Sequence, residues 1–305
     1  MSLMRSLGTP VTVGLISLAA PAFAGAEGRI EINQVDAAIG GVTPGDAPGF
    51  PVTLDRPGSY VLTGNLATSD VNESALRVLA DGVTIDLAGF QIEGPALCSG
   101  SGETFGCSSG SGSGIDATGR QRTAIHGGTI RGFADYGVRL GDASRVFDLR
   151  LRRNGRGGVI GSDRCIARSV HALENDGAGI DLGHSAVVVD SLTHRNAEAG
   201  IEGDFAAVLI GNASQTNGGD GLSGLFGGNV IHANTAVENA GNGIRASDGA
   251  LVTRNVLQAN ETRNLFLNAS AGYARNVITS TASSPVTVVG GVALDGNLCD
   301  NGACP

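Results

Sequence analysis

The sequence predicts an all-β fold: a single-stranded right-handed parallel β-helix, a solenoid that is capped at both ends. A Gly or Asn followed by an aliphatic residue recurs seven times, at steps of 21, 21, 21, 21, 22 and 21 residues. A period held over six steps indicates a solenoid, in which each repeat packs on its neighbours. The pairs are Gly137-Val138, Gly158-Val159, Gly179-Ile180, Gly200-Ile201, Gly221-Leu222, Gly243-Ile244 and Asn264-Leu265.

An asparagine stands four residues before most of these pairs. The set is Asn154, Asn175, Asn196, Asn217, Asn239 and Asn260. We expect these side chains to stack amide on amide at one turn of each coil, and the glycine beside them to supply an unusual φ. A second asparagine column, Asn212, Asn234, Asn255 and Asn276, predicts the same stacking at another turn.

Three inward positions recur in each repeat. Around Asn154 they are Val146, Leu151 and Val159, and the same columns in other repeats hold apolar or small residues without charge. Each lies on a short run that alternates between inward and outward positions, as a strand does. Three short strands per coil of about 21 residues therefore describe the β-helix. The L-x-x-L-x-L pattern of a leucine-rich repeat is absent.

The chain divides into four segments. Residues 1–24 predict a signal peptide, because Arg5 precedes a short apolar run that ends in the cleavage pattern Ala22-Phe23-Ala24. We expect an exported protein with no transmembrane segment, in the periplasm or outside the cell. Residues 25–80 predict an N-terminal cap, 81–290 the β-helix with an inserted loop at 95–114, and 291–305 a C-terminal tail.

Export makes disulfides the preferred interpretation of the cysteines. Cys98 with Cys107, and Cys299 with Cys304, form two local pairs, although the sequence leaves other connectivities open. Neither spacing matches a zinc site, so no metal is expected. Cys165 falls in a column of small residues and predicts a buried thiol.

The charge pattern points away from nucleic acid as a partner. The net charge is −9 and the chain contains no lysine, so nucleic-acid binding is not expected.

The arginines are unevenly distributed, because eight of the 20 lie between Arg139 and Arg168. The repeat places five basic side chains outward on one sheet across four adjacent coils: Arg131, Arg150, Arg152, His171 and His194. Arginine captures carboxylate or sulfate well, so these residues predict a site for an anionic polymer; the alternative is a solvated face.

A pair of carboxylates is the second candidate for chemistry. Asp181 and Glu202 occupy the same outward column in consecutive coils, about one strand spacing apart. Paired carboxylates can divide acid and base roles because mutual repulsion raises one pKa. The other members of the column vary freely, so ordinary surface variety is the preferred explanation of the pair, and Asp181 and Glu202 are only weak catalytic candidates.

Three segments carry a family resemblance: Gly58 to Leu66, Val83 to Phe90 and Gly128 to Phe133. With the coils, they resemble exported bacterial right-handed β-helix repeat proteins of the pectin-lyase-like fold. The resemblance implies a fold shared by polysaccharide lyases, hydrolases, epimerases and adhesins. The catalytic patterns expected of its hydrolases and epimerases (Asn-Thr-Asp, Gly-His-Gly, Arg-Ile-Lys, Asp-Pro-His-Glu) do not occur here. No catalytic residue of that family can therefore be assigned to a position of this sequence. No cofactor is expected, except calcium if the chain is a lyase.

An outward apolar stripe is a candidate contact for a second copy or for the N-terminal segment. It comprises Val187, Val189, Val208, Ile210, Val230 and Leu251. The sequence as a whole favours an exported module that binds an acidic polysaccharide. Two alternatives stay open. One is a polysaccharide lyase or hydrolase that uses Asp181 and Glu202 with nearby arginine, and the other is a structural or adhesive surface rod.

Overall fold

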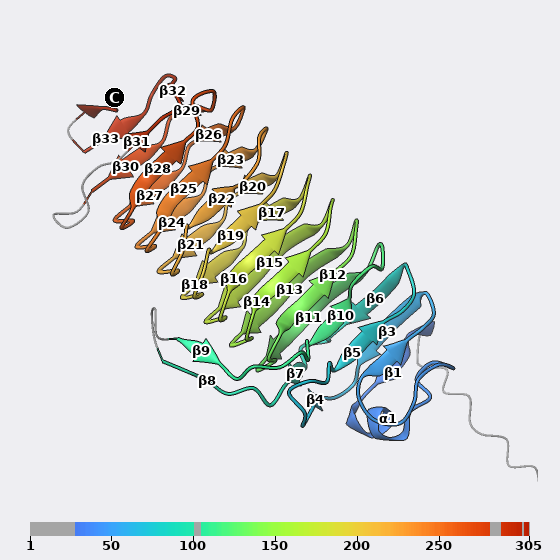
Figure 1. Cartoon of the computed structure of the whole chain (residues 1–305). Helices are drawn as coiled ribbons and strands as arrows, with labels where there is room; N and C mark the ends of the chain where they lie inside the picture. Colours follow the sequence, from blue (N-terminus) through green and yellow to red (C-terminus); the bar gives the residue numbers. More distant parts are fainter. Residues whose placement is uncertain (1–27, 101–104, 281–287, 301, 305) are drawn as a thin grey trace, which may run out of the picture.

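A computed structural model describes residues 28–100, 105–280, 288–300 and 302–304, so the expected signal peptide lies outside the described residues. The chain forms a right-handed parallel β-helix, seen in Figure 1 as a rod of stacked coils that runs from the N-terminal to the C-terminal end. The predicted fold class is confirmed. Strands of successive coils pair in parallel and build two long sheets, here called sheet A and sheet B.

Sheet B takes one strand from each coil. Its strands are β2 (Val52–Leu54), β5 (Leu76–Val78), β10 (Ile115–Ala117), β12 (Tyr136–Leu140), β14 (Gly157–Gly161), β16 (Ala178–Leu182), β19 (Ile201–Gly203), β22 (Leu222–Gly224), β25 (Asn242–Ala246), β28 (Arg263–Leu267) and β31 (Val288–Val289).

Sheet A consists of two ribbons, which share three long bent strands: β11 (Ala124–Arg131), β13 (Arg145–Arg152) and β15 (Ile166–Leu173). Ribbon 1 adds β1 (Ile30–Ile32), β3 (Gly58–Leu62), β6 (Val83–Asp86), β17 (Val187–Val189), β20 (Val208–Ile210), β23 (Val230–His232), β26 (Leu251–Thr253), β29 (Gly272–Ala274) and β32 (Val292–Ala293). Ribbon 2 adds β4 (Leu66–Ala67), β7 (Gln91–Glu93), β18 (Leu192–His194), β21 (Ala213–Gln215), β24 (Thr235–Val237), β27 (Val256–Gln258), β30 (Val277–Thr279) and β33 (Leu298–Cys299).

The aliphatic columns stack in register inside the rod. In sheet B, Val159 pairs with Ile180 and Ile180 pairs with Ile201, and all three side chains are fully buried. The apolar side chains of each coil are therefore buried by the apolar side chains of the adjacent coils, and a single coil could not bury them alone.

Each coil turns its corners with single left-handed residues. In the coil around Asn175 these are Arg164, Ser169 and Glu174, with φ of 59°, 53° and 53°. A left-handed conformation costs a non-glycine residue roughly 1–2 kcal/mol. No residue pattern predicts these corners, since most of them are not glycine.

The glycine column beside the asparagines has a different role from the one expected. Gly179 does not adopt a positive φ. A Cβ on Gly179 would instead lie 2.7 Å from the Gly200 carbonyl oxygen and 2.8 Å from Asn196 Nδ2. The expectation of an unusual φ was therefore wrong, and the column is glycine because two coils and an amide approach it closely.

Two buried asparagine ladders run along the rod. In the first, each Nδ2 from Asn154 to Asn239 donates to the Oδ1 of the asparagine in the next coil at 2.9 to 3.0 Å, and Asn260 Nδ2 ends the ladder on Asn264 Oδ1, four residues along the chain, at 2.9 Å. In the second, the bonds run from Asn212 to Asn297 at 3.0 to 3.1 Å. The ladders satisfy amides that no water reaches, and so they fix the register of the coils.

The N-terminal end is covered by a short helix, α1 (Gln34–Ile39). Its N-cap is Asn33, whose side chain accepts from the backbone of Val35 and Asp36. Strands β2 to β5 already pair in the two sheets, so the stack starts earlier than the expected boundary at residue 81. At the other end, β34 (Gly302–Ala303) pairs antiparallel with β33, and Cys299 is bonded to Cys304.

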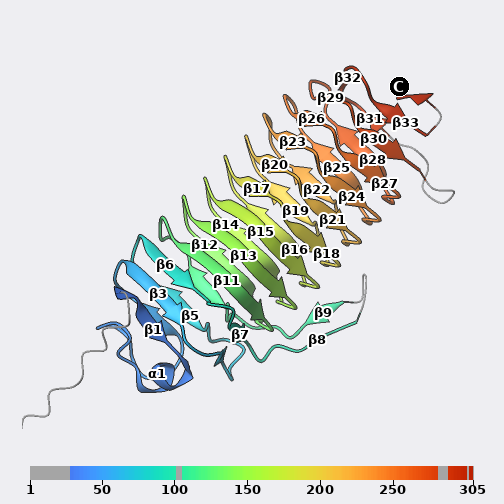
Figure 2. The ribbon, with the colours of Figure 1, turned by 180° about the vertical axis from the view of Figure 1, so that it is seen from behind.

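The inserted loop forms a hairpin that leaves the stack. It contains β8 (Cys98–Ser99) and β9 (Gly106–Cys107), joined by the Cys98–Cys107 disulfide, as predicted. Figures 1 and 2 show the hairpin running beside later coils of the rod. The Cys107 backbone N–H donates to Asp176 Oδ2 at 2.8 Å and anchors it there. The third prediction about cysteines also holds, because Cys165 is a buried free thiol.

The first ladder allows a direct test in Asn196→Ala. This change removes the bonds from Asn175 Nδ2 at 2.9 Å, to Asn217 Oδ1 at 3.0 Å and to the Ala172 carbonyl at 3.0 Å. Buried donors are left without acceptors, so we expect urea denaturation to show a loss of about 3–5 kcal/mol in unfolding free energy. The control is Asn72→Ala, at an exposed asparagine, which should change it by less than about 0.5 kcal/mol. Equal losses in the two variants would contradict the role of the ladder.

Candidate functional site: an arginine face and an acidic face

The five predicted basic residues lie on the outward side of ribbon 2, here called the arginine face: Arg131, Arg150, Arg152, His171 and His194. Arg131 pairs in register with Arg152, and Arg150 pairs with His171. Leu151 between the two β13 arginines is fully buried, so both arginines point outward. The members of each of these pairs thus lie about one strand spacing apart, whereas Leu173 stands between Arg152 and His194.

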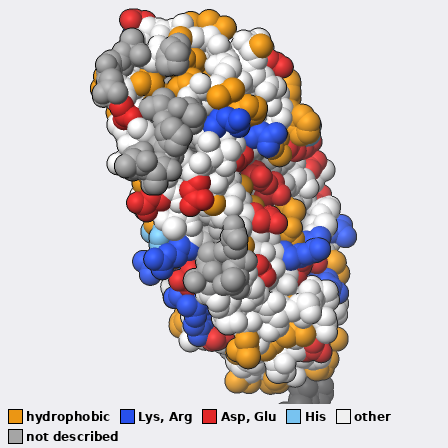
Figure 3. Space-filling model, turned by 60° about the vertical axis from the view of Figure 1, so that its left-hand side comes forward, with side chains coloured by type: hydrophobic (Ala, Val, Ile, Leu, Met, Phe, Trp, Pro, Cys, Tyr) orange, Lys and Arg blue, Asp and Glu red, His pale blue; other side chains and the backbone are white. Residues whose placement is uncertain are grey.

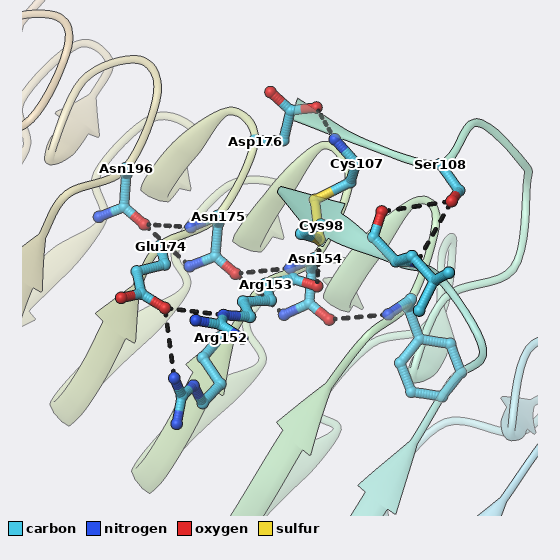
Figure 4. Close-up of a disulfide and its surroundings, with 12 residues drawn as sticks. Cys98, Cys107, Ser108, Arg152, Arg153, Asn154, Glu174, Asn175, Asp176 and Asn196 are labelled. Carbon is cyan, nitrogen blue, oxygen red and sulfur yellow. Dashed lines mark hydrogen bonds and ion pairs between the residues drawn. A yellow bond between two sulfur atoms is a disulfide. The ribbon is translucent and has the colours of Figure 1, made fainter. Parts of the chain in front are cut away.

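Two of the arginines have acidic partners. An Arg131 guanidinium nitrogen lies 2.5 Å from Glu93 Oε1, and Arg152 lies 3.2 Å from Glu174 Oε2. Glu174 also accepts from Arg153 Nε at 2.8 Å, as Figure 4 shows. Burial alone would raise the pKa of Glu174, but the two arginine hydrogen bonds outweigh burial and hold this pKa below its usual value.

Arg150 supplies the unneutralised charge of the face. Its side chain is exposed and forms no ion pair with any residue that the structure describes. His194 adds little charge at neutral pH, because burial, and then the nearby Arg195, lower its pKa. Four arginines, counting Arg153, thus face two glutamates, and the surplus is positive.

A groove of about 690 Å³ opens beside the arginine face. The hairpin forms one wall through Cys98 and Phe105, and the turn that follows ribbon 2 forms the floor through Arg153, Glu174 and Arg195. In Figure 3, arginine and acidic side chains lie next to one another on the surface of the molecule. The sequence did not predict the groove, because the path of the hairpin follows no repeat.

Asp181 and Glu202 lie on the outward side of sheet B, which we call the acidic face. They are direct partners in register on β16 and β19. Burial, then Asp204 and Glu198, raise the pKa of Asp181 to about 6. Burial, then Asp181 and other carboxylates including Asp220, raise the pKa of Glu202 to about 7. At neutral pH the pair therefore contains one group that can hold a proton and one that is ionised.

Carboxylates dominate the surroundings of this pair. Every charged neighbour that shifts the pKa of Asp181 or Glu202 is a carboxylate. Two arginines stand in the same column, each two coils from the pair: Arg139, which is bound to Asp135 at 2.9 Å, and Arg245, which follows Ser223. The pair can exchange protons, but its surroundings do not favour a polyanionic substrate.

Sequence reasoning missed two polar residues on the acidic face. Ser223 is only 1% exposed although it lies in an outward column, and its Oγ has no hydrogen-bond partner among the described residues. The Asn242 Oδ1 atom is also buried and has no hydrogen-bond partner among the described residues. No sequence pattern marks either residue, because burial at an outward position depends on neighbouring coils.

The expected apolar stripe lies outward on ribbon 1. Five of its members are half-buried, and Leu251 is 44% exposed.

Among the described residues there is no group of three or more His, Cys, Asp or Glu that could hold a metal ion. Within the same part of the chain, no helix has the length and apolar character needed to cross a membrane.

Comparison with known proteins identifies the fold but no family. No protein-family model and no curated protein matches the sequence. Among solved structures, a mutant of the periplasmic alginate epimerase AlgG covers 82% of this chain and 77% of its own, at 12% identity and a TM-score of 0.60. The A-module of the mannuronan C-5 epimerase AlgE4 from Azotobacter vinelandii covers 80% and 87%, at 14% identity and a TM-score of 0.53. The chain therefore shares the right-handed β-helix of the pectin-lyase-like fold, as the sequence resemblance predicted.

The raised pKa values of the carboxylate pair predict a pH-dependent stability. The folded protein holds protons that the unfolded chain has lost, so stability falls as pH rises from about 4 to 7. At pH 8, Glu202→Gln should raise the free energy of unfolding by about 1–3 kcal/mol, and the gain should vanish near pH 4. Urea denaturation at the two pH values measures this. Glu31→Gln, at an exposed glutamate of β1, is the control and should show no such dependence. A gain that is the same at both pH values would contradict the assignment.

Proposed function

We propose that this chain binds an acidic polysaccharide, outside the cytoplasm, through the arginine face. The observation that carries the proposal is the in-register cluster of Arg131, Arg150 and Arg152, in which Arg150 has no acidic partner among the described residues. A guanidinium presents parallel N–H donors that match a carboxylate or sulfate. In a chain of net charge −9, such a face is where a polyanion would be attracted.

The form of the surface suits an extended ligand. The arginine face follows the axis of the rod over β11, β13, β15 and β18, so a polymer laid along the rod meets side chains at successive coils. The groove under the hairpin adds Arg153 and Arg195 to the path of such a polymer, which would end before Glu238 and Glu261 because these carboxylates repel it. Glu93 and Glu174 hold two of the arginines in place, which limits the conformational entropy lost on binding.

Two further observations support this ligand class, and a third supports a location outside the cytoplasm. The solved structures with this fold include proteins named for action on alginate and mannuronan. Aromatic residues make up only 4% of the chain and tryptophan is absent, which disfavours stacking on neutral sugars. The two disulfides favour an oxidising compartment.

The test is binding of a polyuronate to Arg150→Gln. Removing the unpaired guanidinium should weaken binding roughly tenfold at low ionic strength, and added salt should weaken binding by the native chain. Affinity electrophoresis in gels that contain alginate or polygalacturonate measures both effects. Arg77→Gln changes an exposed arginine of β5 in sheet B and serves as the matched control. The proposal fails if the native chain is not retarded, or if the two variants behave alike.

A further inference from the structure

The acidic face contains more hydrogen-bond acceptors than its described residues use. Ser223 follows Glu202 in register, and Leu222 and Gly224 on either side of it are inward residues. The Ser223 hydroxyl therefore points to the same side as the Glu202 carboxylate, yet it is buried without a partner. Leaving such a group unsatisfied costs about 1–3 kcal/mol, so a ligand that supplied a partner would recover this free energy.

Asn242 is held so that its oxygen stays available. Its backbone N–H and its Nδ2 both donate to Asp220 Oδ1, at 2.7 and 2.8 Å. The amide nitrogen is thereby engaged, and the buried Oδ1 is left without a donor among the described residues. An amide oxygen can only accept, so the missing partner must be an N–H or O–H group.

The charges around these two atoms select the sign of the ligand. Asp181, Glu198, Glu202, Asp204 and Asp220 act on one another across adjacent coils of sheet B. Two arginines of the following coils border the acceptors, Arg245 in register with Ser223 and Arg263 in register with Asn242, so a cation would sit on the side of Asp181 and Glu202. A cation placed among these carboxylates would relieve their mutual repulsion, whereas an anion would add to it.

The ligand must also be larger than a metal ion. A divalent cation such as calcium needs six to eight oxygen atoms at about 2.3–2.6 Å, largely from converging carboxylates. The described residues offer no group of three acidic, histidine or cysteine side chains that could hold one. The acceptors are spread along neighbouring strands, which suits an organic cation that carries several donors.

We propose that the acidic face binds an amino sugar, with its ammonium group at the in-register pair Asp181 and Glu202 and its hydroxyl groups on Ser223 Oγ and Asn242 Oδ1. An ammonium donates three hydrogen bonds and matches the carboxylates in charge. A sugar hydroxyl can accept from Ser223 and donate to Asn242. This site is separate from the arginine face and does not depend on polyuronate binding.

Calorimetry follows the titration of the protein with three trisaccharides at pH 7, where Asp181 is largely ionised and Glu202 about half ionised. They are the glucosamine trimer, the N-acetylglucosamine trimer, in which acetylation removes the charge, and the uncharged glucose trimer. We expect the glucosamine trimer to bind at least about tenfold more tightly than the other two. Ser223→Ala should weaken its binding about fivefold, and Glu202→Gln about tenfold, while Arg77→Gln should leave it unchanged.

Several outcomes would overturn the proposal. They are equal affinity for the acetylated and free trimers, no saturable binding of any trimer, and unchanged binding by Ser223→Ala. Displacement of the trimer by millimolar calcium, with tighter calcium binding, would assign a metal site instead. If Ser223→Ala does not fold, Glu202→Gln decides alone, because this change removes charge repulsion and is expected to stabilise the fold.

Discussion

The fold depends on the exact stacking of buried amides along the rod. An asparagine amide without a partner in a dry interior is unfavourable by several kcal/mol, and only the next coil in the correct register supplies the partner. Hydrophobic contacts alone would tolerate small shifts of one coil on another, because they are not directional. The ladders that contain Asn196 and Asn234 remove that freedom, and the close approach at Gly179 leaves no room for a side chain.

Strict register has consequences for the surface. Because each outward side chain lies beside its counterpart in the next coil, charges of one sign come together wherever the sequence repeats them. The arginine face offsets this repulsion with Glu93 and Glu174. The acidic face has no such compensation, and Asp181 and Glu202 respond by retaining protons. The two surfaces are thus opposite outcomes of one geometric rule.

Much of the fold could be predicted because the repeat is written in residue identities. The columns of Val159 and Asn175 recur every 21 or 22 residues, and spacing alone gave their burial and their partners. The left-handed corners at Arg164 and Glu174 could not be predicted, since their conformation is imposed by the closure of the coil. The path of the Cys98–Cys107 hairpin has no periodic counterpart, so the groove it borders was also missed.

The buried Ser223 hydroxyl illustrates why site prediction from a repeat is limited. The repeat correctly implied an outward side chain, but exposure at an outward position depends on the size and charge of residues in the coils above and below. A stack selected only for stability would replace the uncompensated carboxylates and this hydroxyl with small or apolar groups, since neither contributes favourably to folding. Their concentration on one face, beside a row of carboxylates, is the pattern expected where binding, rather than folding, determines the residue.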